Sequence, residues 1–217
     1  MINLNQEQKL WNAGYKYVAG VDEAGRGPLA GPVVAACVVL DTNFISHHPE
    51  LAKVNDSKKL SAKAREALFP LIKDHVLAVE ISVVSHEMID RINILQASLL
   101  AMRRAVAACS VKPDYILVDG QQKIPQLDIP QETIINGDAT VFAIAAASII
   151  AKVSRDYLLS EYDKKYPQYG FKQHKGYGTK QHLAAIGELG PCPIHRLTFA
   201  PFAPAKKNKS AYLKKRP

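Results

Sequence analysis

Two adjacent carboxylates, Asp22 and Glu23, follow an apolar, partly β-branched run at residues 17–21 that predicts a buried strand. Acids beside a core must be hydrated, paired with cations or bound to metal, because an uncompensated buried carboxylate is costly. The residues that follow, A-G-R-G-P-L-A-G-P, predict a tight turn through their glycines and prolines. A second apolar run at residues 33–40 completes a predicted hairpin. Taken alone, the two acids have a simpler alternative, which is a solvated strand end.

The turn itself favours a phosphate ligand. Gly25 and Gly27 flank Arg26, so the backbone N–H groups and the guanidinium can approach a ligand closely. Both kinds of donor suit phosphate and sugar hydroxyls. Carboxylates beside such a loop would repel a phosphate unless a divalent cation lay between them. The combination therefore indicates a metal-assisted site.

Two more acids occur in similar settings. Asp119 ends an apolar run that starts at Tyr115, and Gly120 follows it. Asp138 precedes a segment at residues 141–166 that is apolar on every face for its first eleven residues, which predicts a buried helix. An acid at the start of such a helix would face an interior cleft. The alternative for Asp138 is that it is only the N-cap of that helix.

The elements that must position these acids indicate an α/β domain with a mixed sheet. Strands are predicted at residues 17–21, 33–40, 76–84, 114–118 and 132–135. Helices are predicted at residues 2–13, 61–74, 95–106, 141–166 and 180–189. Residues 167–179 are polar, glycine-rich and basic, and their aromatic residues are suited to stack on sugars or bases. An ordinary surface loop is the alternative there, and periodicity does not give the strand order.

The chain resembles the ribonuclease HII family, the type 2 ribonucleases H that cut RNA within RNA–DNA hybrids. The hairpin motif D-E-A-G-R-G-P-L-A-G-P carries this resemblance first. Further matches follow in order: N-D-S-K-K-L at 55–60, Y-I-L-V-D-G at 115–120, G-D-A-T with I-A-A-A-S-I-I-A-K-V-S-R-D at 137–156, H-K-G-Y-G-T at 174–179, and P-I-H-R-L-T-F-A-P at 193–201. The resemblance spans roughly residues 16–204.

The resemblance implies a ribonuclease H-like fold, with a mixed five-stranded central sheet flanked by helices and a C-terminal helical extension. In that fold the first and fourth strands lie side by side. This adjacency would bring Asp22 and Asp119 to one edge, with Asp138 approaching from the last helix. Glu23 would join them only if the strand breaks, because neighbouring side chains of a regular strand point to opposite faces.

Four carboxylates in one cleft cannot all stay ionised without cations. Hard oxygen ligands select Mg2+ or Mn2+ over zinc. We therefore expect a two-ion site for phosphodiester hydrolysis. Its metal ligands and catalytic residues would be Asp22, Glu23, Asp119 and Asp138.

The resemblance also implies the substrate. It would be an RNA–DNA hybrid or duplex DNA containing a ribonucleotide, cut during DNA replication and repair to leave a 5′-phosphate and a 3′-hydroxyl. The loop of Gly25, Arg26 and Gly27 would read the 2′-hydroxyl that distinguishes RNA from DNA, and Tyr177 would stack beneath its sugar. Lys58 and Lys59 would contact the substrate backbone, although a solvated loop is the alternative. Further candidates for substrate contact or structural support are Ser148, Lys152, Arg155, Lys175, His195 and Arg196.

Length and composition favour one domain at residues 1–204, in which residues 167–204 form a substrate-binding extension. The net charge is +8, but the last thirteen residues hold six of the 28 basic residues and no acid. Residues 205–217 are therefore predicted to be a flexible basic tail. No apolar run could span a bilayer and no signal peptide is recognisable. We expect a cytoplasmic monomer whose three separated cysteines stay reduced.

Three other functions compete with this one. A type 3 ribonuclease H would resemble D-E-x-G-x-G without the arginine, and would need an additional N-terminal domain for which the roughly fifteen residues before the first strand leave no room. A resolvase-like nuclease of the same fold would cut DNA. A non-catalytic nucleic-acid-binding protein would rely on the basic tail. The absence of G-x-x-x-x-G-K-[ST] and of H-E-x-x-H argues against a P-loop enzyme and a zincin.

Overall fold

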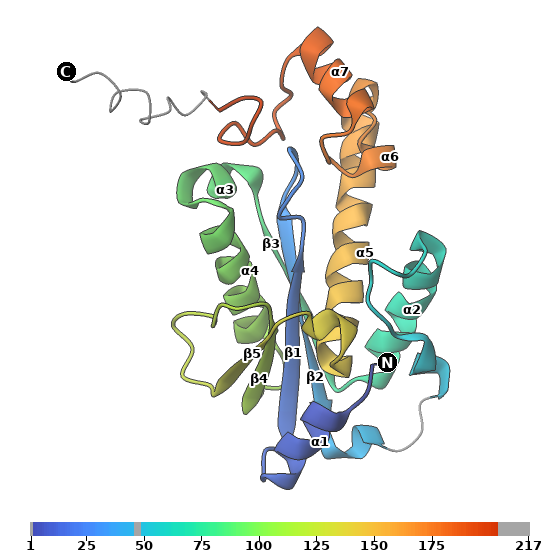
Figure 1. Cartoon of the computed structure of the whole chain (residues 1–217), viewed down its shortest axis with the longest axis vertical. Helices are drawn as coiled ribbons and strands as arrows, with labels where there is room; N and C mark the ends of the chain where they lie inside the picture. Colours follow the sequence, from blue (N-terminus) through green and yellow to red (C-terminus); the bar gives the residue numbers. More distant parts are fainter. Residues whose placement is uncertain (1, 46–48, 204–217) are drawn as a thin grey trace, which may run out of the picture.

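The computed structural model describes residues 2–45 and 49–203. A five-stranded sheet in the order β3-β2-β1-β4-β5 lies at the centre, with helices on both of its faces (Figure 1). The predicted basic tail at residues 205–217 lies outside the described residues. The strands are β1 Tyr17–Ala24, β2 Val33–Asp41, β3 Ala78–Val84, β4 Tyr115–Asp119 and β5 Gln131–Ile134. The α-helices are α1 Asn5–Asn12, α2 Ala62–His75, α3 His86–Ile92, α4 Ile94–Ala108, α5 Phe142–Lys165, α6 Phe171–His174 and α7 Lys180–Leu189.

The sheet follows directly from the apolar runs. β1 and β2 form the predicted antiparallel hairpin, and β1 pairs with β4 in parallel, as the resemblance implied. Residues 33–40 of β2 are fully buried, because α4 covers one face of the sheet and α5 covers the other. This double cover explains why β2 is a continuous apolar run rather than an alternating one.

Helix α5 lies against the sheet through its small residues. Its first ten residues are all buried, as the apolar sequence predicted. A Cβ atom at Gly20 of β1 would collide with the backbone of Ala143, so a glycine is required for this close approach. The approach fixes where Ser148 and Lys152, further along α5, meet the end of β1.

The start of α5 differs from the simplest expectation. Asp138 is not the N-cap, because α5 begins at Phe142 and Asp138 lies in a separate 3₁₀ turn, Gly137–Ala139. The cap residue Val141 makes no side-chain cap hydrogen bond. Instead, the backbone N–H of Ala143 donates to the buried Glu7 carboxylate of α1 at 2.8 Å. An acid 136 residues earlier in the chain therefore caps this helix, where a carboxylate also suits the helix dipole.

The C-terminal extension forms a small core of its own against the end of α5. Tyr169 and Phe171 are buried in it, so the prediction that the aromatic residues of this loop stack on a substrate is wrong for these two. Three buried histidines pack with them: His174, His182 and His195. The third aromatic residue of the loop, Tyr177, is exposed to solvent.

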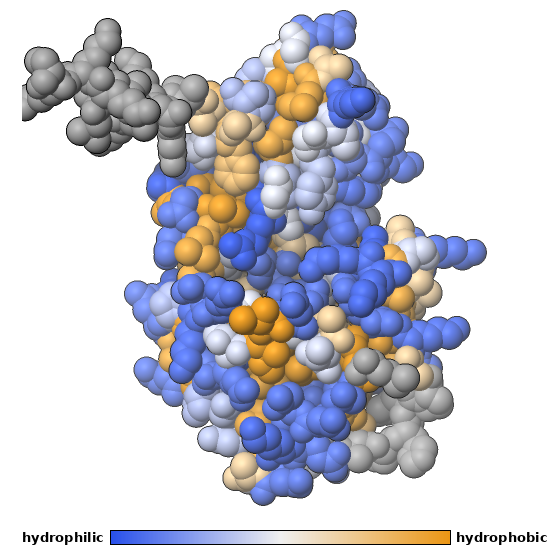
Figure 2. Space-filling view, in the orientation of Figure 1, coloured by the Kyte–Doolittle hydropathy of each residue, from blue (hydrophilic) through white to orange (hydrophobic). Residues whose placement is uncertain are grey.

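Polar and charged residues cover most of the face shown in Figure 2, with apolar residues gathered toward the α6–α7 end and in a smaller patch near the middle. Among the helices of the described residues, none is both long enough and apolar enough to cross a membrane.

Candidate functional site

A cavity of about 320 Å³ opens at the carboxyl ends of β1 and β4. Strand β1 supplies the acids, the following turn supplies the G-R-G loop, and α5 supplies polar groups from the opposite wall. The predicted site residues that line the cavity are Asp22, Glu23, Gly25, Arg26, Gly27, Lys58, Asp119, Ser148, Lys152 and Tyr177. The predicted site residues that are not in its wall are Lys59, Asp138, Lys175 and Arg196.

The two acids of β1 reach this cavity without a break in the strand. β1 continues in regular register through Ala24, where Asp22 is opposite Ala36 and Glu23 is opposite Ala35. The expectation that the strand must break at Glu23 is therefore wrong. The parallel pairing with β4 ends one residue before Asp22, at Val21 and Val118. Beyond that point this edge of β1 is open, so side chains from both faces can reach the same space.

The carboxylates raise one another's proton affinity. Burial, together with the charges of Glu23 and Asp119, raises the pKa of Asp22 well above its usual range. Burial also raises the pKa of Glu23 to about 7, although Arg26 at 3.2 Å partly offsets this effect. Burial and the charge of Asp138 raise the pKa of Asp119. The cluster therefore requires added positive charge to be fully ionised near neutral pH.

Asp138 joins the cluster through hydrogen bonds. Its backbone N–H donates to Asp119 Oδ1 at 3.3 Å, and its own carboxylate accepts from Lys58 Nζ at 2.8 Å. This hydrogen bond raises the pKa of Lys58. Two of the four acids thus have a cation of the chain as partner, Arg26 for Glu23 and Lys58 for Asp138.

The donor set suits a hard divalent cation. Asp22 makes no ion pair among the described residues, although the charge of Lys58 acts on it, and it accepts hydrogen bonds from the Ser148 hydroxyl and from the Glu23 N–H at 2.7 Å. Within the described ranges, no three His, Cys, Asp or Glu side chains are yet grouped closely enough to hold an ion. Arg26 and Lys58 each hold one of the acids in an ion pair. Buried carboxylates with raised pKa values fit Mg2+ or Mn2+, because a divalent ion supplies the positive charge that keeps them ionised.

Two buried arginines hold the G-R-G loop in place. Arg196 is fully buried, and its guanidinium donates to the backbone carbonyls of Gly25, Arg26, Pro28, Gly31 and Pro32. Arg155 donates to the carbonyls of Ala30, Pro32 and Lys175. Of the two roles considered for these arginines, the geometry supports structural support rather than contact with a substrate.

Tyr177 is held beside this loop by the histidines. Its side chain is 45% exposed, and a Cβ atom added to Gly27 would lie 3.5 Å from its ring. His182 Nδ1 donates to the Tyr177 carbonyl at 2.9 Å, and His174 Nδ1 accepts from the N–H of Gly176 at 3.2 Å. His182 Nε2 also lies 3.0 Å from His195 Nε2. Three histidines that are far from adjacent in the sequence, His174, His182 and His195, thus form one cluster behind the Tyr177 loop.

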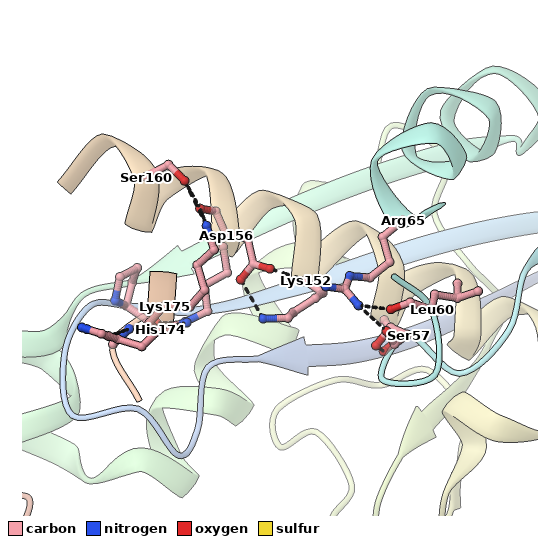
Figure 3. Close-up of polar contacts among 12 residues, drawn as sticks. Ser57, Leu60, Arg65, Lys152, Asp156, Ser160, His174 and Lys175 are labelled. Carbon is pink, nitrogen blue, oxygen red and sulfur yellow. Dashed lines mark hydrogen bonds and ion pairs between the residues drawn. The ribbon is translucent and has the colours of Figure 1, made fainter. Parts of the chain in front are cut away.

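Polar contacts along α5 link Lys152, through Asp156 and Arg65, to Ser57 (Figure 3). Asp156 accepts from Lys152 Nζ at 2.7 Å and lies 3.9 Å from Arg65. Arg65 donates to the carbonyls of Ser57 and Leu60, which fixes the loop that carries Lys58.

Lys175 turns toward the same part of α5, and its Nζ donates to Ser160 Oγ at 3.0 Å (Figure 3). It lines a neighbouring cavity with Arg65 and Asp156. Ser57 contacts the main site directly, with its Oγ 2.9 Å from Ser148 Oγ. Sequence reasoning missed Ser57, Arg65 and Asp156. Ser57 and Asp156 lie within the matching motifs and Arg65 lies outside them, and no spacing in the sequence signals that the three meet.

Comparisons with known proteins agree with this geometry. The family model for Ribonuclease HII matches residues 19–202 of the chain. Ribonuclease HII from Acholeplasma laidlawii (strain PG-8A) is 55% identical over 201 residues, which cover 93% of this chain and 96% of that protein.

Two solved structures share the fold. The crystal structure of ribonuclease H2 from Pyrococcus horikoshii OT3 matches with a TM-score of 0.71 at 30% identity, covering 86% of this chain and 95% of that one. Bst-RNase HIII in complex with Mn2+ matches with a TM-score of 0.65 at 20% identity, covering 86% of this chain and 68% of that one. The family model and the bacterial relative both cover most of the chain. The chain therefore belongs to the ribonuclease HII family, with ribonuclease H activity on RNA–DNA hybrids.

Proposed function

We propose that this ribonuclease H cuts at single ribonucleotides embedded in duplex DNA as well as within RNA–DNA hybrids, leaving 5′-phosphate and 3′-hydroxyl ends. One observation carries the proposal: the acids Asp22, Glu23 and Asp119 line the same cavity as the G-R-G loop and Tyr177. A phosphodiester and the sugar beside it would thus meet both groups at once. We further propose that the enzyme works as a cytoplasmic monomer in DNA replication and repair.

Asp22, Glu23, Asp119 and Asp138 would hold two divalent ions, Mg2+ or Mn2+. When bound, such ions activate water and neutralise charge at a phosphodiester in an in-line displacement. Binding would require Arg26 and Lys58 to release Glu23 and Asp138, which frees both cations for the phosphates of the substrate. The Ser148 hydroxyl would keep Asp22 oriented through its hydrogen bond.

The remaining residues would select and position the strand. Gly25 and Gly27 leave the backbone N–H groups of the loop open to a ribose 2′-hydroxyl, the group that distinguishes RNA from DNA. Tyr177 offers an exposed ring face against which a sugar can pack. Lys58 and Lys152 line the cavity and supply positive charge for phosphates. We propose outer phosphate contacts for Lys59, which lies on the same loop as Lys58, and for Lys175, whose Nζ would have to leave Ser160 Oγ to make one.

The test is incubation with a DNA duplex that contains one ribonucleotide, and with an RNA–DNA hybrid, in the presence of Mg2+ and then of excess chelator. We expect both to be cut, the chelator to stop cutting, and an all-DNA duplex to stay intact. Asp22→Asn should lose activity while its circular dichroism spectrum and melting behaviour remain those of a folded protein. Near-wild-type turnover of that variant would remove the metal-site proposal. Cutting of an all-DNA junction regardless of the ribonucleotide would favour the resolvase-like alternative.

A further inference from the structure

A second cavity, of about 420 Å³, lies on the other side of the acids of β1 and β4. Glu23, Arg26 and Asp119 line both cavities, so these three side chains form a shared wall. The rest of the second cavity comes from α4 and from the segments that follow β4 and β5. Nothing in the proposed function uses this space.

The lining of the second cavity suits an uncharged ligand. Leu95, Leu99 and Met102 of α4 supply apolar surface, and Gln121 and Gln122 supply amide groups. Its charged lining residues are those of the shared wall, where Arg26 already pairs with Glu23. Beyond Arg26 in the shared wall, a phosphate would find no positive charge in this lining. A planar group with apolar faces and polar edges, such as a nucleobase with its sugar, would find both kinds of contact.

One polar group in this wall lacks a partner. Ser98 is 2% exposed, and its hydroxyl makes no hydrogen bond within the described part of the chain. A serine inside a helix commonly bonds the carbonyl one turn earlier, and a buried hydroxyl without any partner is destabilising. Such orphaned groups are uncommon in native proteins and require an explanation. The hydroxyl oxygen is not exposed to the second cavity in this structure, so a ligand there would supply the missing partner once the Ser98 side chain turns toward it.

We propose that the second cavity binds the nucleoside on the opposite side of the scissile phosphate from the ribonucleotide held at Tyr177. A strand crossing the shared wall of acids would place successive nucleosides in the two cavities. The apolar side chains of α4 would contact the base, and Ser98 with Gln121 and Gln122 would hydrogen-bond its polar edge. This inference rests on the proposed function, because the ribonucleotide defines which neighbour is meant.

The test combines base removal with side-chain removal. Duplexes with one ribonucleotide would carry an abasic residue at either of its two neighbours in the same strand. We expect the wild type to lose about tenfold in kcat/KM with one of these duplexes, which is the order expected for one or two lost contacts. Gln121→Ala/Gln122→Ala and Ser98→Ala should each lose up to about tenfold on the intact duplex and almost nothing more on that abasic duplex.

The controls separate this proposal from a structural effect and from the proposed function. Gln96→Ala, on the same helix but lining a different cavity, should match the wild type on every duplex. Ser98→Ala should melt no lower than the wild type, because its hydroxyl has no partner to lose. Two results would overturn the inference. One is that the variants lose as large a factor in kcat/KM on the abasic duplex as on the intact one. The other is that an abasic residue at either neighbour leaves the kcat/KM of the wild type unchanged. If the wild type cuts hybrids but not at an embedded ribonucleotide, the proposed function fails. The same series of abasic substitutions, placed within a hybrid, then still decides whether the second cavity binds a nucleoside.

Discussion

Lys58 Nζ lies 2.8 Å from Asp138 Oδ2, so a flexible cation of the chain occupies an acid that is proposed to bind a divalent ion. The Lys58 side chain is 79% exposed and that of Asp138 only 5%, so Lys58 is the mobile partner. The ammonium and a metal ion cannot hold the same carboxylate oxygen together. Ion binding at Asp138 and the release of Lys58 toward solvent or substrate are therefore linked.

Replacement of Lys58 tests this link. We expect Lys58→Met to bind Mn2+ more tightly in the absence of substrate, because no ammonium competes for Asp138. The same variant should bind the hybrid more weakly. The slope of log affinity against log salt concentration should decrease by about the amount expected for one lost phosphate contact. Electron paramagnetic resonance titration of Mn2+ and hybrid binding at several salt concentrations measure the two effects.

Lys59→Met is the matched control, because Lys59 lies 3.9 Å from Asp56 rather than at an acid of the site. It should alter only the salt dependence of hybrid binding. Equal Mn2+ affinity in Lys58→Met and wild type would contradict the competition between Lys58 and the ion.

Tyr177 is expected to act through its ring. Tyr177→Ala should reduce cutting at a single embedded ribonucleotide at least about tenfold relative to cutting of a continuous hybrid, since a ring stacked on a nucleotide is worth about 1–3 kcal/mol. Tyr177→Phe keeps the ring and should stay close to wild type. The ratio of the two kcat/KM values is the measurement. An unchanged ratio in Tyr177→Ala would show that the ring does not contribute to junction recognition.

Asp156 is expected to keep Lys152 charged. Burial lowers the pKa of Lys152, and the hydrogen bond from its ammonium to Asp156 opposes that effect. Asp156→Asn should lower the pKa of Lys152 further, so that kcat/KM declines at a lower pH on the alkaline side. Lys152→Arg in the Asp156→Asn background should restore the alkaline limb, because a guanidinium stays protonated. An alkaline limb that does not move would leave Asp156 with only a structural role.

Glu7 is expected to make stability depend on pH. Burial raises its pKa from 4.5 to about 7 in the folded chain, so the protonated form favours folding. Its contribution is fully present below about pH 4.5 and is lost as the pH rises through about 7. Glu7→Gln keeps an oxygen for the N–H of Ala143 but does not ionise. We expect this variant to gain up to about 3 kcal/mol over wild type at pH 8 and little near pH 5, measured by urea unfolding. A pH-independent difference would rule out ionisation of Glu7 as the cause.

Local patterns predicted the elements well because each depends on neighbouring residues. The apolar runs gave the hairpin of β1 and β2, and the helix predicted at residues 61–74 is α2, which the Ser61 hydroxyl caps. The parallel pairing of β1 with β4 was implied by the family resemblance, and the structure confirms it. It brings Asp22 and Asp119 to one cavity.

The features that sequence reasoning missed join residues far apart in the chain. Glu7 caps α5 across 136 residues, and Arg196 binds the carbonyl of Gly25 across 171. Periodicity and capping rules describe one helix or strand at a time, so they contain no information on such contacts. The expectation that the strand breaks at Glu23 was wrong for a related reason: the direction of a side chain follows from β1, but the space open to it depends on where the pairing with β4 ends.

The most direct test of the central claim is a count of bound ions. Electron paramagnetic resonance would measure the number of Mn2+ ions bound per chain. The protein would be in complex with an RNA–DNA hybrid whose methylenephosphonate linkages resist hydrolysis. We predict two ions for the wild type, and fewer than two for Asp22→Asn/Asp119→Asn together with a loss of cutting beyond about a hundredfold on an ordinary hybrid. A doubly substituted protein that binds as many ions as the wild type and cuts at a similar rate would contradict the assignment of these carboxylates to the metal site.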